Sequence, residues 1–240
     1  MQDSRSRFTA TTENYRQFRP DYPAALFAWL GALGPGRQAA DLGSGTGIAT
    51  RQLAASGFDV VGVEPNDTMR AAAAAEGGRY VKGEASATTL PGGSVDLVVA
   101  AQAFHWFAVE PTLAEIRRVV RPGGHAVAVW NLRDTTSAFV DGYTRLLRQY
   151  SSEVGKVPRA EPTIAAIRAA EPSARLHAFR HAQRLDRAGV HGRAWSSSYV
   201  AHGVDDGAGF GAALDALFDR HAIDGIVAMA YRVEAVCWEV

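Results

Sequence analysis

Apolar runs of strand length recur along the chain, with segments of helical character between them. These runs predict buried strands over residues 38–42, 59–64, 80–82, 95–101 and 125–130. The intervening segments predict helices over residues 48–56, 67–76 and 111–120, with Asn66 as the N-cap of the second and Arg121-Pro122-Gly123-Gly124 ending the third. Because strands alternate with helices, residues 38–130 predict a doubly wound α/β core whose mostly parallel sheet is buried on both faces.

The flanking segments predict further elements. A helix is expected from about Pro23, and later helices are expected over residues 137–150, 163–170 and 209–221. Residues 179–185 and 226–239 predict two strands that would close the sheet as an antiparallel pair. The 240 residues contain no internal repeat and no linker long enough to separate domains, so we expect a single domain.

The strongest local signal is the segment Asp41-Leu42-Gly43-Ser44-Gly45-Thr46-Gly47, which lies between a predicted strand and a predicted helix. Glycine lets the backbone take positive φ and lets a ligand approach the main chain closely. In an open α/β sheet such a turn lies at the carboxyl edge of the strands, where ligands bind. The segment therefore predicts a binding loop, with a purely structural turn as the alternative.

Residues around this loop narrow the class of ligand. The glycine spacing is G-x-G-x-G, which differs from the G-x-G-x-x-G of dinucleotide sites, and no P-loop lysine follows. Asp41 would repel a pyrophosphate at the helix N-terminus, so a ligand with a cationic end fits better. Glu64 ends the second predicted strand, where a carboxylate can accept hydrogen bonds from both hydroxyls of a ribose. Together these residues predict a positively charged nucleoside without phosphates.

Four motifs follow one another in an order typical of a known superfamily: Ala40 to Gly47, Val63-Glu64-Pro65, Gly83-Glu84-Ala85 and Arg121 to Gly124. The sequence resembles the class I S-adenosylmethionine-dependent methyltransferases. Residues 101–107 and 19–23 are similar to the bacterial type 11 group that includes trans-aconitate methyltransferase-like proteins. The resemblance implies a Rossmann-like fold with a seven-stranded sheet. It also implies an N-terminal lid over residues 1–34, a cofactor-binding core over 35–131, and substrate-side helices with closing strands over 132–240.

The resemblance also implies roles in holding S-adenosylmethionine. Asp41 would lie near the ammonium of the methionine part, and Glu64 would hold the ribose hydroxyls. Glu84 and Ala85 would border the adenine, although the family more often has aspartate at position 84. The full expected cofactor-binding set is Asp41, Gly43, Ser44, Gly45, Gly47, Glu64, Pro65, Glu84, Ala85, Ala101 and Gln102. For each carboxylate the alternative is a solvated loop charge.

His105 follows the fourth predicted strand by four residues and is the candidate catalytic residue, either as a general base or as part of the pocket wall. Arginines suit the recognition of carboxylates, which makes Arg16 and Arg19 candidates for holding an acceptor; a solvated face and contact with the cofactor's carboxylate are the alternatives. The expected acceptor-binding set is Tyr15, Arg16, Arg19, Tyr22, His105, Trp106, Trp130, Asn131, Trp195 and Tyr199.

Composition excludes several classes of protein. Twenty-five acidic and 25 basic side chains give zero net charge, which argues against a dedicated nucleic-acid or membrane-surface binder. The single cysteine, Cys237, excludes an intrachain disulfide and a multi-cysteine zinc site, and we expect no metal. Residues 1–7 lack an apolar signal core, and no apolar stretch approaches the length of about 20 residues that a membrane span needs. We therefore expect a cytoplasmic monomer or homodimer.

The leading hypothesis is methyl transfer to a small molecule, either a carboxylic acid or a natural-product intermediate. A methyl transferase needs a base only when the acceptor must lose a proton. The alternative function is an S-adenosylmethionine-binding regulatory or scaffold protein without methyl transfer. An NAD-dependent oxidoreductase is disfavoured by the glycine spacing and by Asp41.

Overall fold

The computed structural model describes residues 18–240, which form two compact units. Unit 1 comprises residues 18–20, 132–157 and 180–232 of the described chain. Unit 2 comprises residues 21–131, 158–179 and 233–240. Residues 1–17 of the expected lid, which include Tyr15 and Arg16, lie outside the described residues.

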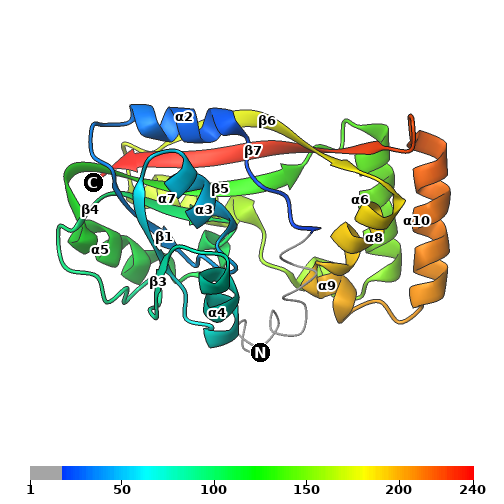
Figure 1. Ribbon diagram of the computed structural model, residues 1–240, viewed down its shortest axis with the longest axis horizontal. Coiled ribbons are helices and arrows are strands. Elements are labelled where there is room, and N and C mark those ends of the chain that lie inside the picture. Colours follow the sequence, from blue (N-terminus) through cyan, green and yellow to red (C-terminus); the bar gives the residue numbers. More distant parts are fainter. Residues whose placement is uncertain (1–17) are drawn as a thin grey trace. The chain divides into compact units, whose positions relative to one another are not determined.

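Seven strands form one sheet in the order β3-β2-β1-β4-β5-β7-β6 (Figure 1). They are β1 (Gln38–Leu42), β2 (Asp59–Val63), β3 (Arg79–Val81), β4 (Val95–Ala101), β5 (Val120–Arg133), β6 (Arg175–Leu185) and β7 (Val227–Glu239). The pairs β1–β2, β1–β4, β2–β3 and β4–β5 are parallel. Hydrogen bonds join Gly124 to Val240 and Asp134 to Ala230, so β7 runs antiparallel to β5. The sequence prediction of a mostly parallel, doubly wound α/β fold is confirmed.

Helices occupy most of the segments between the strands. The α-helices are α2 (Ala24–Ala32), α3 (Ile48–Ala55), α4 (Asp67–Ala75), α5 (Val109–Val119), α6 (Ala138–Tyr150), α7 (Ala160–Ala170), α8 (Arg187–Trp195), α9 (Ser198–Ala201) and α10 (Gly207–His221). Short 3₁₀ helices cover Phe104–Trp106 (η2) and Val154–Lys156 (η3). Asn66 caps α4 as predicted, because its side chain accepts hydrogen bonds from the backbone of Thr68 and Met69.

Some elements differ from those predicted by the sequence pattern. The fifth strand is longer than expected, because β5 begins at Val120 and includes the Arg121-Pro122-Gly123-Gly124 segment. Helices α8 and α9 were not predicted. Gly189 and Gly192 lower the helix propensity of α8, but Asp186 caps it by accepting from the Gly189 N–H.

The core of unit 2 covers both faces of its strands. On one face Val99 of β4 and Val129 of β5 pack with Leu53 of α3. Helix α2 joins this cluster through Leu26, Phe27 and Leu30, so this part of the expected lid is a packed core element. The alternate positions of the same strands, such as Val98 and Ala128, are equally buried. Burial of both faces explains why these strands lack a period-two sequence pattern.

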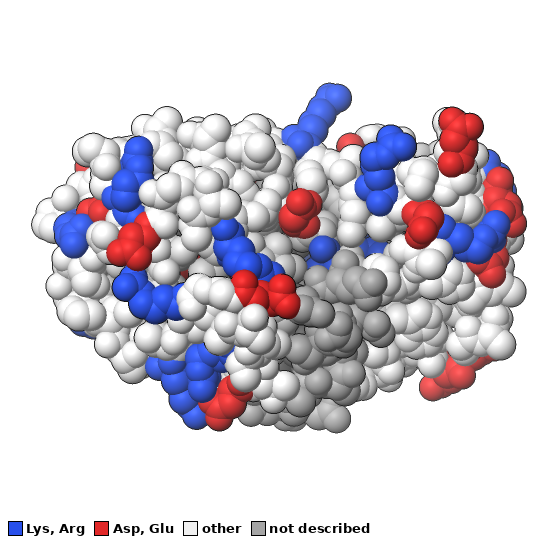
Figure 2. Space-filling view, in the orientation of Figure 1, with Lys and Arg blue, Asp and Glu red and all other residues white. Residues whose placement is uncertain are grey.

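Unit 1 has a separate core. Helices α6, α8 and α10 contribute Tyr143, Val190 and Leu214, which pack with Met229 and Tyr231 of β7. No helix over residues 18–240 is long and apolar enough to cross a membrane. On the face drawn in Figure 2, basic and acidic side chains are interspersed among uncharged ones. Exposed ion pairs of this kind contribute little to stability, so the informative charges are the buried ones.

Candidate functional site

The glycine loop of residues 43–47 joins β1 to α3 at the carboxyl end of the strand. Strand register places Leu42 beside Val63, and the backbone N–H groups of Gly43 and Ser44 both donate to the Val63 carbonyl. Gly43 has a φ of 68°, and a Cβ at this position would lie 2.8 Å from the Ala103 Cβ. The loop thus requires glycine there for both its conformation and its close packing.

Glu64 lies directly after β2 and holds the loop from the neighbouring strand. Its Oε2 accepts from the Gly45 N–H at 2.8 Å, and its Oε1 accepts from the Asn66 N–H at 2.8 Å. The residue is 6% exposed, and burial raises the pKa of its carboxyl group against the opposing effect of these two hydrogen bonds. Since each carboxylate oxygen can accept two hydrogen bonds, each retains capacity for a ligand hydroxyl.

Asp41 is the most deeply buried acidic side chain of this loop, at 1% exposure. Its Oδ2 accepts from the Thr50 hydroxyl at 2.7 Å, whereas its Oδ1 has no hydrogen-bond partner. The pKa of Asp41 is raised to about 7. Burial is the main cause and the nearby Glu64 carboxylate adds to it, whereas the Thr50 hydrogen bond opposes both. A buried carboxylate oxygen without a partner costs free energy. The site therefore suits a ligand that brings a cationic hydrogen-bond donor to Asp41.

Gln102 follows β4 in a strained backbone conformation. Its φ is 54°, a region that non-glycine residues rarely occupy. The Gln102 N–H donates to the Val129 carbonyl, and its side-chain amide donates to the Asn131 carbonyl at 3.1 Å. These bonds fix the ends of β4 and β5, with Ala101 half-buried beside them. Such strain is typical of ligand sites.

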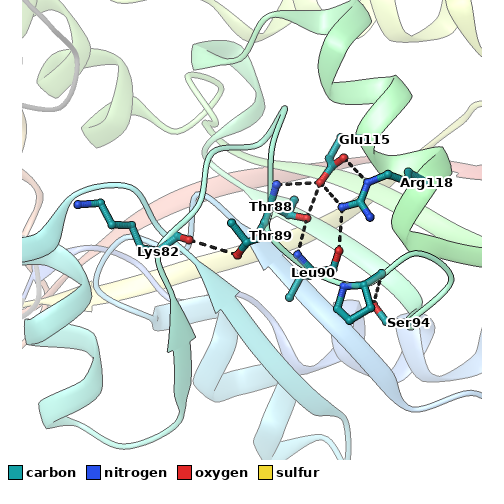
Figure 3. Close-up of polar contacts among 8 residues, drawn as sticks. Lys82, Thr88, Thr89, Leu90, Ser94, Glu115 and Arg118 are labelled. Atoms are coloured by element: carbon teal, nitrogen blue, oxygen red, sulfur yellow. Dashed lines mark hydrogen bonds and ion pairs between the residues drawn. The ribbon is translucent and has the colours of Figure 1, made fainter.

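The loop after β3 carries Glu84 and Ala85, and a buried carboxylate anchors it (Figure 3). Glu115 of α5 accepts from both the N–H and the hydroxyl of Thr88, at 2.8 and 2.6 Å. Arg118 donates to Glu115 and to the Leu90 carbonyl. Hydrogen bonding from Arg118 and Thr88 outweighs burial and lowers the pKa of Glu115 to about 2. Glu84 itself is exposed, and Ala85 is buried. Sequence reasoning missed Glu115, whose partner Thr88 lies 27 residues away.

His105 lies in η2 and contacts Trp130 of β5. The Trp130 indole Nε1 donates to the His105 Nδ1 at 3.1 Å. Because Nδ1 acts as the acceptor, the neutral imidazole carries its proton on Nε2. Trp130 is 1% exposed, and its indole N–H fixes one side of the His105 ring. Trp106 is half-buried and lies beside the His105 ring, with ring centroids 5.3 Å apart.

Asn131 and Tyr22, two other expected acceptor-binding residues, also belong to unit 2. The Asn131 amide donates to the Asp21 carbonyl at 3.1 Å, and Asn131 Oδ1 is buried without a partner. Tyr22 is 6% exposed, and its backbone N–H and carbonyl both bond to the Gln52 amide. Tyr22 is thus part of the packed core of unit 2.

The remaining described members of the acceptor set belong to unit 1. Arg19 donates to the Ser196 carbonyl at 3.3 Å. The Tyr199 hydroxyl accepts from Arg133 at 3.0 Å, and the Trp195 ring lies against Phe210. Sequence reasoning missed Arg133 and also Arg193, which is 5% exposed. No local motif marks either arginine, because the tyrosines that accept from them lie 66 residues from Arg133 and 38 residues from Arg193.

Comparisons with known proteins agree with this geometry. A family model described as a methyltransferase domain matches residues 40–128. The structure of a protein assigned as a type II methyltransferase from Anaeromyxobacter dehalogenans is 30% identical and has a TM-score of 0.64. That alignment covers 92% of this chain and 96% of the other.

Further relatives match part or all of the fold. An uncharacterised methyltransferase of Mycobacterium tuberculosis is 38% identical over 137 residues, which make up 55% of each protein. The chain thus spans about half the length of the curated relatives it matches. A structure from Anabaena variabilis, assigned as a methyltransferase of antibiotic biosynthesis, is 21% identical with a TM-score of 0.62. It covers 90% of this chain and 97% of its own, and it shows the shared fold.

Proposed function

Because the chain belongs to the class I S-adenosylmethionine-dependent methyltransferases, we propose that it transfers the methyl group of S-adenosylmethionine to a small carboxylic acid. Membership of this family supports methyl transfer but does not identify the acceptor. The choice of acceptor is our own, and the trans-aconitate methyltransferase-like subgroup stays a hypothesis based on residues 101–107 and 19–23.

One observation carries the cofactor assignment: the unpartnered, buried Oδ1 of Asp41 lies in β1 just before the loop that Glu64 holds. The Asp41 oxygen suits the ammonium of the methionine part, which would supply the missing donor. Glu64 has acceptor capacity for the ribose hydroxyls, since each of its oxygens uses one backbone N–H. Ser44 adds a buried hydroxyl without a partner, and Pro65 follows Glu64.

S-adenosylmethionine, when bound, supplies a methyl group already activated by attachment to a sulfonium. The protein therefore has mainly to align the reactants and exclude water, and such alignment contributes on the order of 7–11 kcal/mol in favourable cases. Gln102 is suited to position the reacting end, because two hydrogen bonds hold its backbone and side chain rigidly. Glu84 and Ala85 would border the adenine on a loop that Glu115 fixes.

His105 would act as a hydrogen-bond donor to the acceptor. Trp130 donates to its Nδ1, so the neutral ring carries its donor hydrogen on Nε2. A carboxylate acceptor has no proton to lose at neutral pH, so a donor in the pocket wall suits it better than a general base.

Calorimetry with S-adenosylhomocysteine and, separately, with NAD tests the cofactor assignment. We expect binding of S-adenosylhomocysteine and no comparable binding of NAD. The Glu64→Ala variant should weaken binding by roughly 1–3 kcal/mol, because the ribose hydroxyls lose their acceptor. Incubation with methyl-labelled S-adenosylmethionine and a set of small carboxylic acids should then yield labelled esters. Tight NAD binding with indifference to S-adenosylhomocysteine would overturn the assignment.

A further inference from the structure

Unit 1 contains a cluster of arginines and tyrosines gathered from several elements. Arg133 ends β5, Arg193 lies in α8, and Tyr199 lies in α9. Arg133 Nη1 donates to the Tyr199 hydroxyl at 3.0 Å, and Arg193 Nε donates to the Tyr231 hydroxyl of β7 at 3.0 Å. Arg193 Nη1 also donates to the Ser197 hydroxyl at 3.1 Å. Hydroxyl groups of tyrosine and serine are thus the hydrogen-bond partners of both guanidinium groups.

No carboxylate of the described chain neutralises these two charges. Asp134 follows Arg133 in sequence, but its side chain accepts from the backbone and hydroxyl of Thr136. Other acidic residues of unit 1 pair elsewhere, as Asp141 does with Arg145, and as Asp215 and Asp219 do with Arg187. Arg193 is 5% exposed, and its positive charge opposes that of Arg133. A buried charge without a counter-ion is costly, so this cluster is poised to receive an anion.

A tyrosine of the cluster also responds to the excess positive charge. Burial by itself raises the pKa of Tyr199, but Arg133, Arg193 and Arg19 outweigh burial and lower the pKa to about 7. Tyr143 of α6 is 1% exposed, its hydroxyl has no hydrogen-bond partner, and its pKa is raised by burial. Two further titratable groups of the cluster are Tyr231 of β7 and His181 of β6, whose rings stack with centroids 6.2 Å apart.

We propose that Arg133, Arg193 and Tyr199 form a binding site for a carboxylate group of the acceptor. Arg133 and Tyr199 are both partly exposed and would contact the carboxylate directly. Arg193 would contribute mainly its charge, since Nε and Nη1 already donate to hydroxyls. The planar guanidinium matches the two oxygens of a carboxylate. The identification of the bound carboxylate as an acceptor rests on the proposed function, whereas binding of the anion does not.

A bound carboxylate and an ionised Tyr199 would compete for the same positive charge. Carboxylate binding should therefore be coupled to protonation of Tyr199, and affinity should fall as pH rises through the Tyr199 pKa. This coupling gives a readout that does not depend on enzyme activity.

Calorimetry of the full chain without cofactor, at about pH 6 and about pH 8, tests the site with succinate, uncharged succinamide and inorganic phosphate as probes. We expect succinate to bind more tightly at the lower pH and succinamide not to bind. Arg133→Gln should weaken succinate binding about 10- to 100-fold, the usual effect of losing a charge-assisted hydrogen bond. Arg145→Gln is the matched control, because Arg145 is exposed on α6 of the same unit and pairs with Asp141.

Tyr199→Phe provides the second test, through the ultraviolet absorbance of phenolate. The wild type should show a phenolate titration near pH 7, shifted upward by succinate, and the variant should lack both the titration and the pH dependence of binding. If no carboxylate binds, or if Arg133→Gln binds succinate as the wild type does, the proposal is wrong. Binding of phosphate alone would also overturn it, in favour of a phosphate-bearing ligand.

Binding of S-adenosylhomocysteine to the same samples separates the two proposals. If S-adenosylhomocysteine binds but succinate does not, only the carboxylate site fails. If succinate binds but S-adenosylhomocysteine does not, the proposed function fails and the anion site stands.

Discussion

The two units of this chain bury charges of opposite sign. Unit 2 buries Asp41 and Glu64 beside a glycine loop, at 1% and 6% exposure. Unit 1 buries Arg193 and part of Arg133 among tyrosine and serine hydroxyls. Each arrangement costs folding free energy, because among the described residues Asp41 and Arg193 have hydroxyl groups and no opposite charge as side-chain hydrogen-bond partners. Unmatched buried charge in a folded protein is therefore informative about the charge of its ligand, cationic for unit 2 and anionic for unit 1.

A third buried charge shows what a matched site looks like. Glu115 is 8% exposed, nearly as buried as Glu64, yet Arg118 and Thr88 satisfy its carboxylate. Its pKa is lowered, whereas the pKa values of Asp41 and Glu64 are raised by burial. The burial of a carboxylate alone therefore does not indicate a ligand site. The difference between Glu115 and Asp41 is the presence of a cationic partner within the fold.

The largest effect is expected from Asp41→Asn, which removes the charge and keeps the shape. We expect the affinity for S-adenosylhomocysteine to fall about 100-fold, because the ligand ammonium loses its anionic acceptor. In the ligand-free protein the same change should be stabilising by roughly 1–3 kcal/mol above pH 7, since a neutral amide avoids the cost of a buried carboxylate. Calorimetry and urea denaturation measure the two effects.

The pH dependence of this stabilisation follows from the raised pKa. Folded Asp41 has a pKa of about 7, whereas the ordinary pKa of an aspartate is 3.8. The folded state therefore binds more protons between these values, and the wild type loses stability as pH rises through that window. The advantage of Asp41→Asn should be full above pH 7 and should vanish towards pH 4. Asp59→Asn, which removes an exposed carboxylate paired with Arg79, is the control. Unchanged affinity for S-adenosylhomocysteine in Asp41→Asn would contradict the conclusion that the buried charge of unit 2 indicates the charge of its ligand.

Glu115→Gln sharpens the comparison because the sign of its stability effect is opposite. We expect the free energy of unfolding to fall by about 1 kcal/mol near neutral pH, since Arg118 and Thr88 lose their charged acceptor. The partial exposure of Arg118 limits the effect. A lowered pKa stabilises the fold above the unfolded value, so the difference between variant and wild type should shrink as pH falls from 4.5 towards about 2. Urea denaturation at several pH values measures it, with exposed Glu110→Gln as the control. If Glu115→Gln stabilised the fold at pH 7, the conclusion that Arg118 and Thr88 satisfy the Glu115 carboxylate would be wrong.

The proposed cofactor site of unit 2 could be located in the sequence because its signals are local. The predicted bounds of β1 and β4 agree with the structure, and the Asn66 cap was read from one residue type before an alanine-rich helix. Asp41 and Glu64 end neighbouring parallel strands, so strand order alone brings their segments to one edge of the sheet.

In the charged cluster of unit 1, the sequence marked Tyr199 as a candidate but neither Arg133 nor Arg193. Arg133 and Tyr199 are separated by 66 residues, and Arg193 and Tyr231 by 38. Their contacts depend on α8 and α9, two helices whose glycines and short length weaken the sequence pattern. An arginine in a sequence does not reveal whether a carboxylate or a hydroxyl will face it, and that distinction carries the inference.

The smallest effect is expected at His105, a residue of unit 2 whose contact is to a neutral partner. Trp130 donates to Nδ1, so the neutral ring carries its proton on Nε2 and acts there as a hydrogen-bond donor. With a carboxylate acceptor, His105→Ala should lower kcat/KM by less than about tenfold, partly through KM, and leave the pH profile flat between about pH 6 and 7. His105→Gln should recover much of the loss, because its amide can also donate. The measurement is kcat and KM against pH for the three proteins on one confirmed acceptor. A loss of about 10²–10⁴-fold in kcat, with the disappearance of a titration step and no recovery in His105→Gln, would identify a general base. That result would move the acceptor from a carboxylate to an amine, phenol or enol, which must lose a proton when methylated.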